Sequence, residues 1–282
     1  MSKVLELFGI STSEQEVDWR ERIDRQNCPY LHRTCLKVRK SQPEVSIGTC
    51  SVSYGLGGNP VLICPHRLLE RKQIFIDCLH LLNTHEPGNE LHIVPEVSVP
   101  GGSVDYFLVS VKNRKVKDFV GIELQTLDTT GTVWPERERF LKRSGLAVDE
   151  SAVASKKRFG MNWKMTAKTI LVQLHHKIET FEEMNKHLVL VIQDVLLDYM
   201  RREFRFDNLN TARLGEPMHI HSYTAMMQPE QPLRIELDSR WSTDTAGIAA
   251  CLGLQAEAKL GLQQIVRILE TKISDETIFV LQ

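Results

Sequence analysis

The chain has 282 residues, a formal net charge of −1 and 42% hydrophobic residues, which is an ordinary composition for a globular protein. This length fits one large domain, or one domain with a small module, and the net charge by itself does not indicate nucleic-acid binding. No apolar run reaches the roughly eighteen residues that a membrane-spanning helix needs, and the acidic N-terminus does not resemble a signal peptide, so we expect a cytoplasmic protein.

Four of the six cysteines lie in the N-terminal part of the chain: Cys28, Cys35, Cys50 and Cys64. Their gaps are wider than in most zinc knuckles, but Pro29 and Pro65 each follow a cysteine and shape turns that can aim thiolates at a common point. In a cytoplasmic protein such a group favours a metal site over two disulfides, the alternative being four unrelated buried cysteines. We therefore predict that residues 1–75 form an N-terminal region with a four-cysteine module that binds iron or zinc.

Apolar spacing and turn residues predict the elements that follow. The segments with helical spacing are 66–85, 161–184 and 245–272. The predicted strands are 91–99, 103–111, 118–128 and the apolar start of 187–200. Tight turns join the first three strands into a meander. This order predicts an α/β fold with a mixed central sheet flanked by helices, and a core domain over residues 76–282.

Two acids and a glutamine stand in the predicted meander, where buried strands would otherwise be apolar. Asp105 lies at the start of the second strand, and Glu123 and Gln125 lie near the end of the third. Residues i and i+2 of a strand point to one side, so Glu123 and Gln125 converge, and Asp105 joins them if the strands are neighbours. Paired carboxylates suit Mg²⁺, which takes one or two of them together with substrate phosphate. The alternative is a pair of strand-edge acids in contact with solvent.

The segment GGSVDYFLV…FVGIELQ resembles the core of the PD-(D/E)XK nucleases, with Gly102 and Ser103 before the acid in place of Pro-Asp. Together with the four early cysteines, the chain resembles the restriction endonucleases of the NotI type, in which such a core carries an iron module held by four cysteines. The resemblance extends over the cysteine segment, the meander, and the helix and strand after it. It implies a type II restriction endonuclease that acts as a homodimer, with Mg²⁺, on both strands of a palindromic, GC-rich double-stranded DNA site.

The resemblance also implies roles for individual residues. Asp105 and Glu123 match the Mg²⁺-binding acids. Gln125 falls where most PD-(D/E)XK enzymes have lysine, and a glutamine at this position resembles the variant of the NotI group. The Gln125 amide can hydrogen-bond a water or a phosphate oxygen but carries no charge. Lys164 or Lys168 on the following helix is a candidate for the missing cation, with ordinary solvent exposure as the alternative.

A further acid is expected upstream of Asp105, where Glu90 and Glu96 are the candidates. We favour Glu90, because its larger separation leaves room to approach the cation from outside the meander. His219 and His221 can share one strand face, but no third metal ligand is visible, so DNA backbone contact or plain packing is expected for them.

Four runs of the sequence are rich in lysine and arginine: 32–40, 66–72, 112–117 and 155–158. Together they suggest a surface that contacts phosphate, although each run alone also fits an ordinary solvent-exposed face. Two alternatives to a restriction enzyme remain open. One is a repair or recombination nuclease of the same fold, and the other is a non-catalytic DNA-binding protein organised by its four cysteines. A binding protein has no need to keep Asp105, Glu123 and Gln125 in register, so the acids favour a nuclease.

Overall fold

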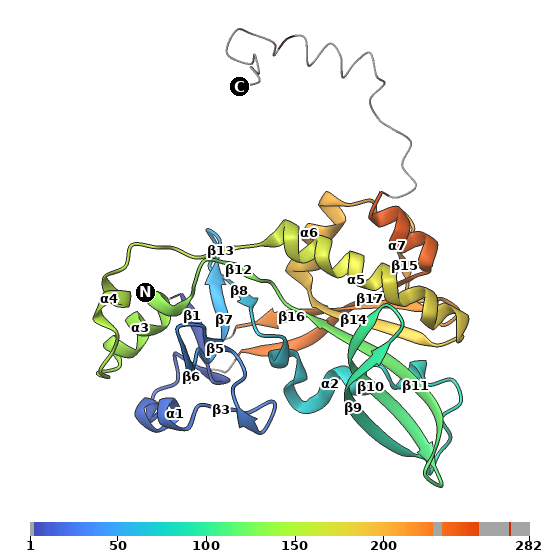
Figure 1. Ribbon diagram of the computed structural model, residues 1–282, viewed down its shortest axis with the longest axis horizontal. Helices are drawn as coiled ribbons and strands as arrows, with labels where there is room; N and C mark the ends of the chain where they lie inside the picture. The colour runs from blue at the N-terminus through green and yellow to red at the C-terminus, as the bar shows by residue number, and fades with distance from the viewer. Residues whose placement is uncertain (1–2, 228–232, 254–270, 272–282) are drawn as a thin grey trace, which may run out of the picture.

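The computed structural model describes residues 3–227, 233–253 and Thr271, and Figure 1 shows their arrangement. Its centre is a seven-stranded sheet with the strand order β15-β17-β16-β14-β11-β10-β9. These strands are β9 (Glu90–Val99), β10 (Gly102–Lys112), β11 (Lys115–Gln125), β14 (His187–Gln193), β15 (Asn210–Thr211), β16 (Met218–Met226) and β17 (Arg234–Thr243). β11, β14 and β16 run parallel and the other neighbours are antiparallel, so the mixed central sheet predicted from the sequence is confirmed.

The meander β9-β10-β11 matches the three strands that the sequence predicts. Its side chains alternate between two apolar layers, since Phe107 packs on one face of the sheet and Leu108 on the other. The turn between β9 and β10 passes very close to the backbone of the covering helix. A Cβ atom on Gly101, which has φ +89°, would lie 2.0 Å from the carbonyl oxygen of His176, so this position requires glycine.

Three helices cover one face of the sheet (Figure 1): α5 (Trp163–Glu183), α6 (Asp194–Glu203) and α7 (Thr245–Cys251). α5 confirms the predicted helix at 161–184, and the predicted stretch 187–200 is the buried strand β14 followed directly by α6. The predicted helix 245–272 begins as α7, and its part after residue 253 lies outside the described residues except for Thr271. Within the described ranges, no helix is long and apolar enough to cross a membrane.

The opposite face is covered by a broken helical segment: η1 (Pro65–Lys72), α2 (Gln73–Ile76) and η2 (Leu79–Leu81). One continuous helix over 66–85 was therefore the wrong prediction. Arg71 and Lys72 have φ values of 52° and 56°, a left-handed conformation that ends a helix. Leu68 and Ile74 nevertheless pack on the sheet, so the apolar pattern reports burial although the helix is interrupted.

A smaller sheet, with the order β2-β1-β7-β8, lies in the N-terminal part of the chain: β1 (Val4–Leu7), β2 (Ile10–Ser11), β7 (Thr49–Tyr54) and β8 (Asn59–Leu62). The short elements around it are α1 (Trp19–Arg25), β3 (Asn27–Cys28), β4 (Arg33–Thr34), β5 (Val38–Arg39) and β6 (Gln42–Ser46). After β11 the chain adds β12 (Thr129–Thr130), α3 (Trp134–Arg143), α4 (Glu150–Ala154) and β13 (Gly160–Met161). The ring of Trp19 meets that of Phe140 edge-on at 5.0 Å, so the N-terminal core includes a segment from beyond residue 75.

Candidate active site

Asp105 and Glu123 stand opposite each other on the sheet face that α5 covers. In the antiparallel pair β10-β11, Tyr106 is opposite Ile122, so the next position places Asp105 opposite Glu123. A hydrogen bond of 2.8 Å from the backbone N–H of Leu124 to Oδ2 of Asp105 agrees with this register. The structure therefore brings together the two acids that the sequence singles out.

Burial makes both carboxyl groups hold a proton more tightly than they would in water. Glu123 is only 5% exposed, and desolvation raises its pKa to about 7. A hydrogen bond from Lys177 lowers this pKa, and the charge of Asp105 raises it. Desolvation also raises the pKa of Asp105, opposed by the Leu124 N–H and by Lys177. Two desolvated acids that repel each other gain the most from a nearby cation.

Lys177 of α5 is the nearby cation. Its Nζ donates to Oε1 of Glu123 at 2.5 Å and to the backbone oxygen of Ser103 at 2.5 Å, and the residue is 5% exposed. A Cβ atom on Gly102, which has φ +136°, would lie 3.1 Å from Cε of this lysine, so the second glycine of the turn leaves room for the side chain. The ion pair explains how a glutamate can be buried here, because an unpaired buried carboxylate would be strongly destabilising.

Lys164 and Lys168, the candidates for this cation in the sequence, are both exposed on α5, which agrees with the alternative of ordinary solvent exposure. The residue that reaches the acids is Lys177, which follows Ile170 and Leu174 on the buried side of the helix. Lysine is almost never fully buried unless it is paired. A lysine on the apolar stripe of an amphipathic helix was therefore the available signal for a buried ion pair.

The structure does not bring Glu90 to the acids. Glu90 is paired with Val111 at the far end of the β9-β10 ladder, and its carboxyl group contacts Nε2 of His92 at 3.2 Å. Pro95 and Val97 of β9 pair with Tyr106 and Val104, the two neighbours of Asp105 in β10, so Glu96 lies beside Asp105 in the ladder. The charge of Glu96 raises the pKa of Asp105. The preference for Glu90 is therefore corrected to Glu96, because strand register and not sequence separation decides which acid is near.

Gln125 follows Glu123 on the same side of β11 and is half-buried. Its Nε2 donates to the backbone oxygen of Thr126 at 2.6 Å, which fixes the orientation of the amide. An oriented amide can direct its carbonyl oxygen at a water molecule. Gln125 thus contributes hydrogen bonding without charge, while Lys177 contributes the charge.

His66 connects the cysteine segment to the acids. Burial lowers the pKa of this imidazole and the charge of Arg33 lowers it further, whereas Asp105 and Glu96 act in the opposite direction. The ring therefore lies within electrostatic reach of both acids. Its Nδ1 atom is buried without a hydrogen-bond partner among the described residues. Nothing in the sequence pattern marked His66 as part of the site.

The four N-terminal cysteines are free thiols. A hydrogen bond from Cys50, assisted by backbone N–H groups and the charge of Lys37, lowers the pKa of Cys64 to about 7 against desolvation. Burial raises the pKa of Cys28 and Cys35, and the charge of Cys64 adds to both shifts, so the sulfurs lie within electrostatic reach of one another. In the part of the chain that the structure describes, however, no group of three or more His, Cys, Asp or Glu side chains has the arrangement of a metal site.

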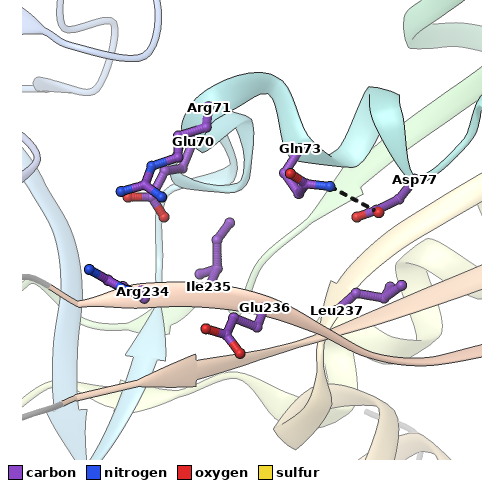
Figure 2. Close-up of a pocket in the computed structure, with 8 residues that line it drawn as sticks. All are labelled: Glu70, Arg71, Gln73, Asp77, Arg234, Ile235, Glu236 and Leu237. Atoms are coloured by element: carbon purple, nitrogen blue, oxygen red, sulfur yellow. Dashed lines mark hydrogen bonds between the residues drawn. The ribbon is translucent and has the colours of Figure 1, made fainter.

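A pocket of about 240 Å³ lies on the other side of the sheet, between the broken helical segment and β17 (Figure 2). Its lining residues are Glu70, Arg71, Gln73, Asp77 and residues 234–237. Acidic and basic side chains are mixed there, and Asp77 already accepts hydrogen bonds from Tyr223 at 2.7 Å and Gln73 at 3.1 Å. Three acidic side chains face two basic ones in this pocket, so it has no excess of positive charge and is a poor candidate for binding phosphate.

The same face holds four neighbouring histidines. The ring of His219 lies 5.1 Å from that of His187 and 6.4 Å from that of His221, and the ring of His80 stacks on His221 at 6.0 Å. His219 and His221 are 0% exposed, and burial lowers their pKa values to about 4 and about 3. Of the two expectations for His219 and His221, packing is confirmed and DNA backbone contact is wrong, because neither side chain reaches the surface.

The candidate active site thus combines two desolvated acids, one buried ammonium and one oriented amide at the end of the meander. Such a set can hold a divalent cation and orient a phosphate group. Compared with protein-family models and with curated proteins, the chain has no match.

Proposed function

We propose that the protein is a Mg²⁺-dependent deoxyribonuclease of the PD-(D/E)XK kind, acting as a type II restriction endonuclease. The observation that supports this most is the convergence of Asp105, Glu123 and Lys177 at one end of a three-strand meander in a mixed sheet. The resemblance to the NotI type adds the substrate, a palindromic and GC-rich site in double-stranded DNA.

The carboxylates fit Mg²⁺ in number and in available atoms. Among the described hydrogen bonds, Leu124 takes one oxygen of Asp105 and Lys177 takes one oxygen of Glu123, which leaves the second oxygen of each for a cation. Mg²⁺ keeps several waters and needs only one or two carboxylates besides substrate phosphate. With a pKa of about 7, the Glu123 carboxyl is partly protonated at neutral pH, and a bound cation would displace that proton.

Each polar side chain then has a role. Asp105 and Glu123 hold the metal, which when bound polarises the phosphodiester and lowers the pKa of a bound water. Lys177 lowers the pKa of Glu123 against desolvation and fixes the orientation of the carboxyl group, and it replaces the charge that Gln125 does not carry. Gln125 orients the attacking water through its amide.

The four cysteines would hold one structural iron or zinc ion. Four thiols within electrostatic reach, with Cys64 close to ionisation at neutral pH, form a donor set that these metals favour. The ion would tie β3, β7 and the start of η1 together and thereby fix His66 beside the acids. Elemental analysis of the purified protein tests this, since one iron or zinc atom per chain is expected. Freely titratable thiols without either metal would contradict it.

Symmetric cutting of a palindrome requires one active site for each strand, related by a two-fold axis, so a homodimer is expected. Sedimentation with and without duplex DNA tests the stoichiometry. A monomer in both conditions would contradict symmetric cutting.

Incubation with plasmid and genomic DNA in Mg²⁺ tests the function directly, with Ca²⁺ as the matched non-catalytic cation. Discrete fragments are expected, and sequencing their ends gives the site and the overhang. Cleavage only at junctions or flaps would indicate a repair nuclease of the same fold. Retardation of DNA without cutting would indicate a binding protein.

A further inference from the structure

Two basic runs that are far apart in the sequence come together in space. One lies at residues 37–40 along β5, and the other lies at residues 155–158 between α4 and β13. Two hollows of about 810 Å³ and 650 Å³ contain both runs and share Ser155 and Lys157 in their walls. We name the two hollows together the basic groove.

The basic groove has a large excess of positive charge. Eight lysine and arginine side chains line it against two acidic ones, and both acids are paired, Asp149 with Arg39 at 3.2 Å and Glu136 with Arg139 at 2.7 Å. The remaining cations, for which the described residues provide no acidic partner, are Lys3, Lys37, Lys40, Lys156, Lys157 and Arg158. In a chain with a net charge of −1, this concentration of charge indicates a site for a polyanion.

Trp134 gives the groove a fixed wall. The guanidinium groups of Arg39 and Arg137 lie over its ring, at 4.5 Å and 4.4 Å from the ring centroid, and the residue is buried. It therefore offers no free aromatic face to an unpaired base. Proteins that bind single strands use such faces for stacking, so the wall favours a duplex whose bases stay paired.

The basic groove begins close to the candidate active site. Thr129, in its wall, is four residues after Gln125, and four extended residues span at most about 14 Å. Phosphates of one DNA strand follow each other at about 3.4 Å along the helix axis. A duplex with one phosphate at Asp105 and Glu123 would therefore have phosphates of the same strand within about four positions of the groove.

We propose that the basic groove binds the phosphate backbone of duplex DNA beside the cleaved position, an inference that rests on the proposed nuclease function. It assigns backbone contacts to Lys40, Lys156, Lys157 and Arg158, whose side chains are exposed. Such contacts fix the orientation of the duplex and carry no sequence information. Recognition of bases falls to other parts of the protein.

The test compares two triple variants that lose the same charges, two lysines and one arginine each. Lys156→Ala/Lys157→Ala/Arg158→Ala removes cations from the groove, and Arg114→Ala/Lys115→Ala/Lys117→Ala removes exposed cations from the turn and start of β11, at the other end of the meander. Fluorescence anisotropy with a labelled duplex of about three helical turns, in Ca²⁺, gives affinity between about 50 and 200 mM salt. Thermal melting confirms that both variants fold.

The groove variant should bind the duplex roughly 10²-fold more weakly at about 0.1 M salt. The slope of the logarithm of the binding constant against the logarithm of the salt concentration should become shallower by about 0.9 for each lost phosphate contact. The control variant should match the unmodified protein. Equal binding by both variants would overturn the groove assignment while leaving the nuclease proposal intact, provided that Mg²⁺ still supports cleavage. Tighter binding of a single strand than of a duplex would also overturn it. A protein that neither binds nor cuts DNA would remove both proposals.

Discussion

The two faces of the central sheet bury polar groups in different ways. Under α5, the Glu123 carboxylate is paired with the Lys177 ammonium. On the other face, both ring nitrogens of His219 lack a hydrogen-bond partner among the described atoms. Burial shifts the pKa values of Glu123, His219 and His221 toward the neutral form, so desolvation alone does not distinguish a reactive site from the core. The difference lies in the counter-charge and in Asp105, which stays partly accessible beside Glu123, whereas His219 and His221 are fully buried.

The largest expected effect separates the two faces by activity. Glu123→Gln removes a metal ligand with little change of shape, so cleavage should fall by at least about 10³-fold, while binding of duplex DNA in Ca²⁺ persists. His221→Phe, on the opposite face, should leave the cleavage rate within about twofold. Single-turnover cleavage measured for both variants checks this. Wild-type cleavage by Glu123→Gln would show that the acid under α5 is merely structural.

The next effect concerns the counter-charge. Lys177→Met leaves Glu123 buried without its partner, so stability should fall by about 3 kcal/mol at pH 8. Loss of the ammonium raises the pKa of Glu123 further, while the unfolded chain releases this proton near the ordinary value of 4.5. The unmodified folded protein already retains this proton up to about pH 7, so the destabilisation by Lys177→Met should be smaller at pH 5 than at pH 8 and should grow chiefly above about pH 7.

Urea unfolding at both pH values measures this change in stability. Lys168→Met, on the exposed side of the same helix, should change stability by less than about 0.5 kcal/mol. The double variant Lys177→Met/Glu123→Gln should recover part of the loss, because it removes the unpaired charge. A loss that is independent of pH would show that Lys177 stabilises the fold by packing and not through its charge.

The histidine face should respond to pH in the opposite sense. The pKa values of His219 and His221 in the folded protein, about 4 and about 3, lie below the ordinary value of 6.5, so the unfolded chain takes up protons first as pH falls. Each histidine should cost about 2 kcal/mol of stability between pH 6.5 and pH 5. His221→Phe should remove the contribution of one histidine to this loss of stability, so the unfolding free energy should depend less steeply on pH. A pH dependence of the unfolding free energy that is unchanged in His221→Phe would contradict the assignment.

Much of the active-site face was predictable because it depends on local periodicity. The two-residue alternation of β11 places Glu123 and Gln125 on one side, and the tight turns make β10 and β11 neighbours, which brings in Asp105. The interruption of the predicted helix at 66–85 was not predictable in the same way. Arg71 and Lys72 adopt left-handed conformations without the glycine or asparagine that usually marks them.

The residues that complete each face depend on contacts that no local pattern encodes. Lys177 reaches Glu123 only because the glycine turn lets α5 approach β10 closely, and the same lysine would be solvated on a more distant helix. The four histidines come from η2, β14 and β16, so their proximity depends on the parallel pairing of strands with a helix between them. Sequence spacing cannot supply that register.

The smallest expected effect distinguishes Glu96 from Glu90. Glu96→Gln should slow cleavage roughly tenfold, because its charge lies beside Asp105, whereas Glu90→Gln should have no effect at the far end of the ladder. Glu96 raises the pKa of Asp105, so its removal should lower that pKa and let Asp105 ionise at a lower pH. The acid limb of the pH–rate profile should therefore move to lower pH in Glu96→Gln and stay in place in Glu90→Gln. If Glu90→Gln shifted the acid limb of the pH–rate profile instead, the pairing of β9 with β10 in the active protein would have to differ from the one described. Glu90 would then be the further acid, as the sequence separation suggested.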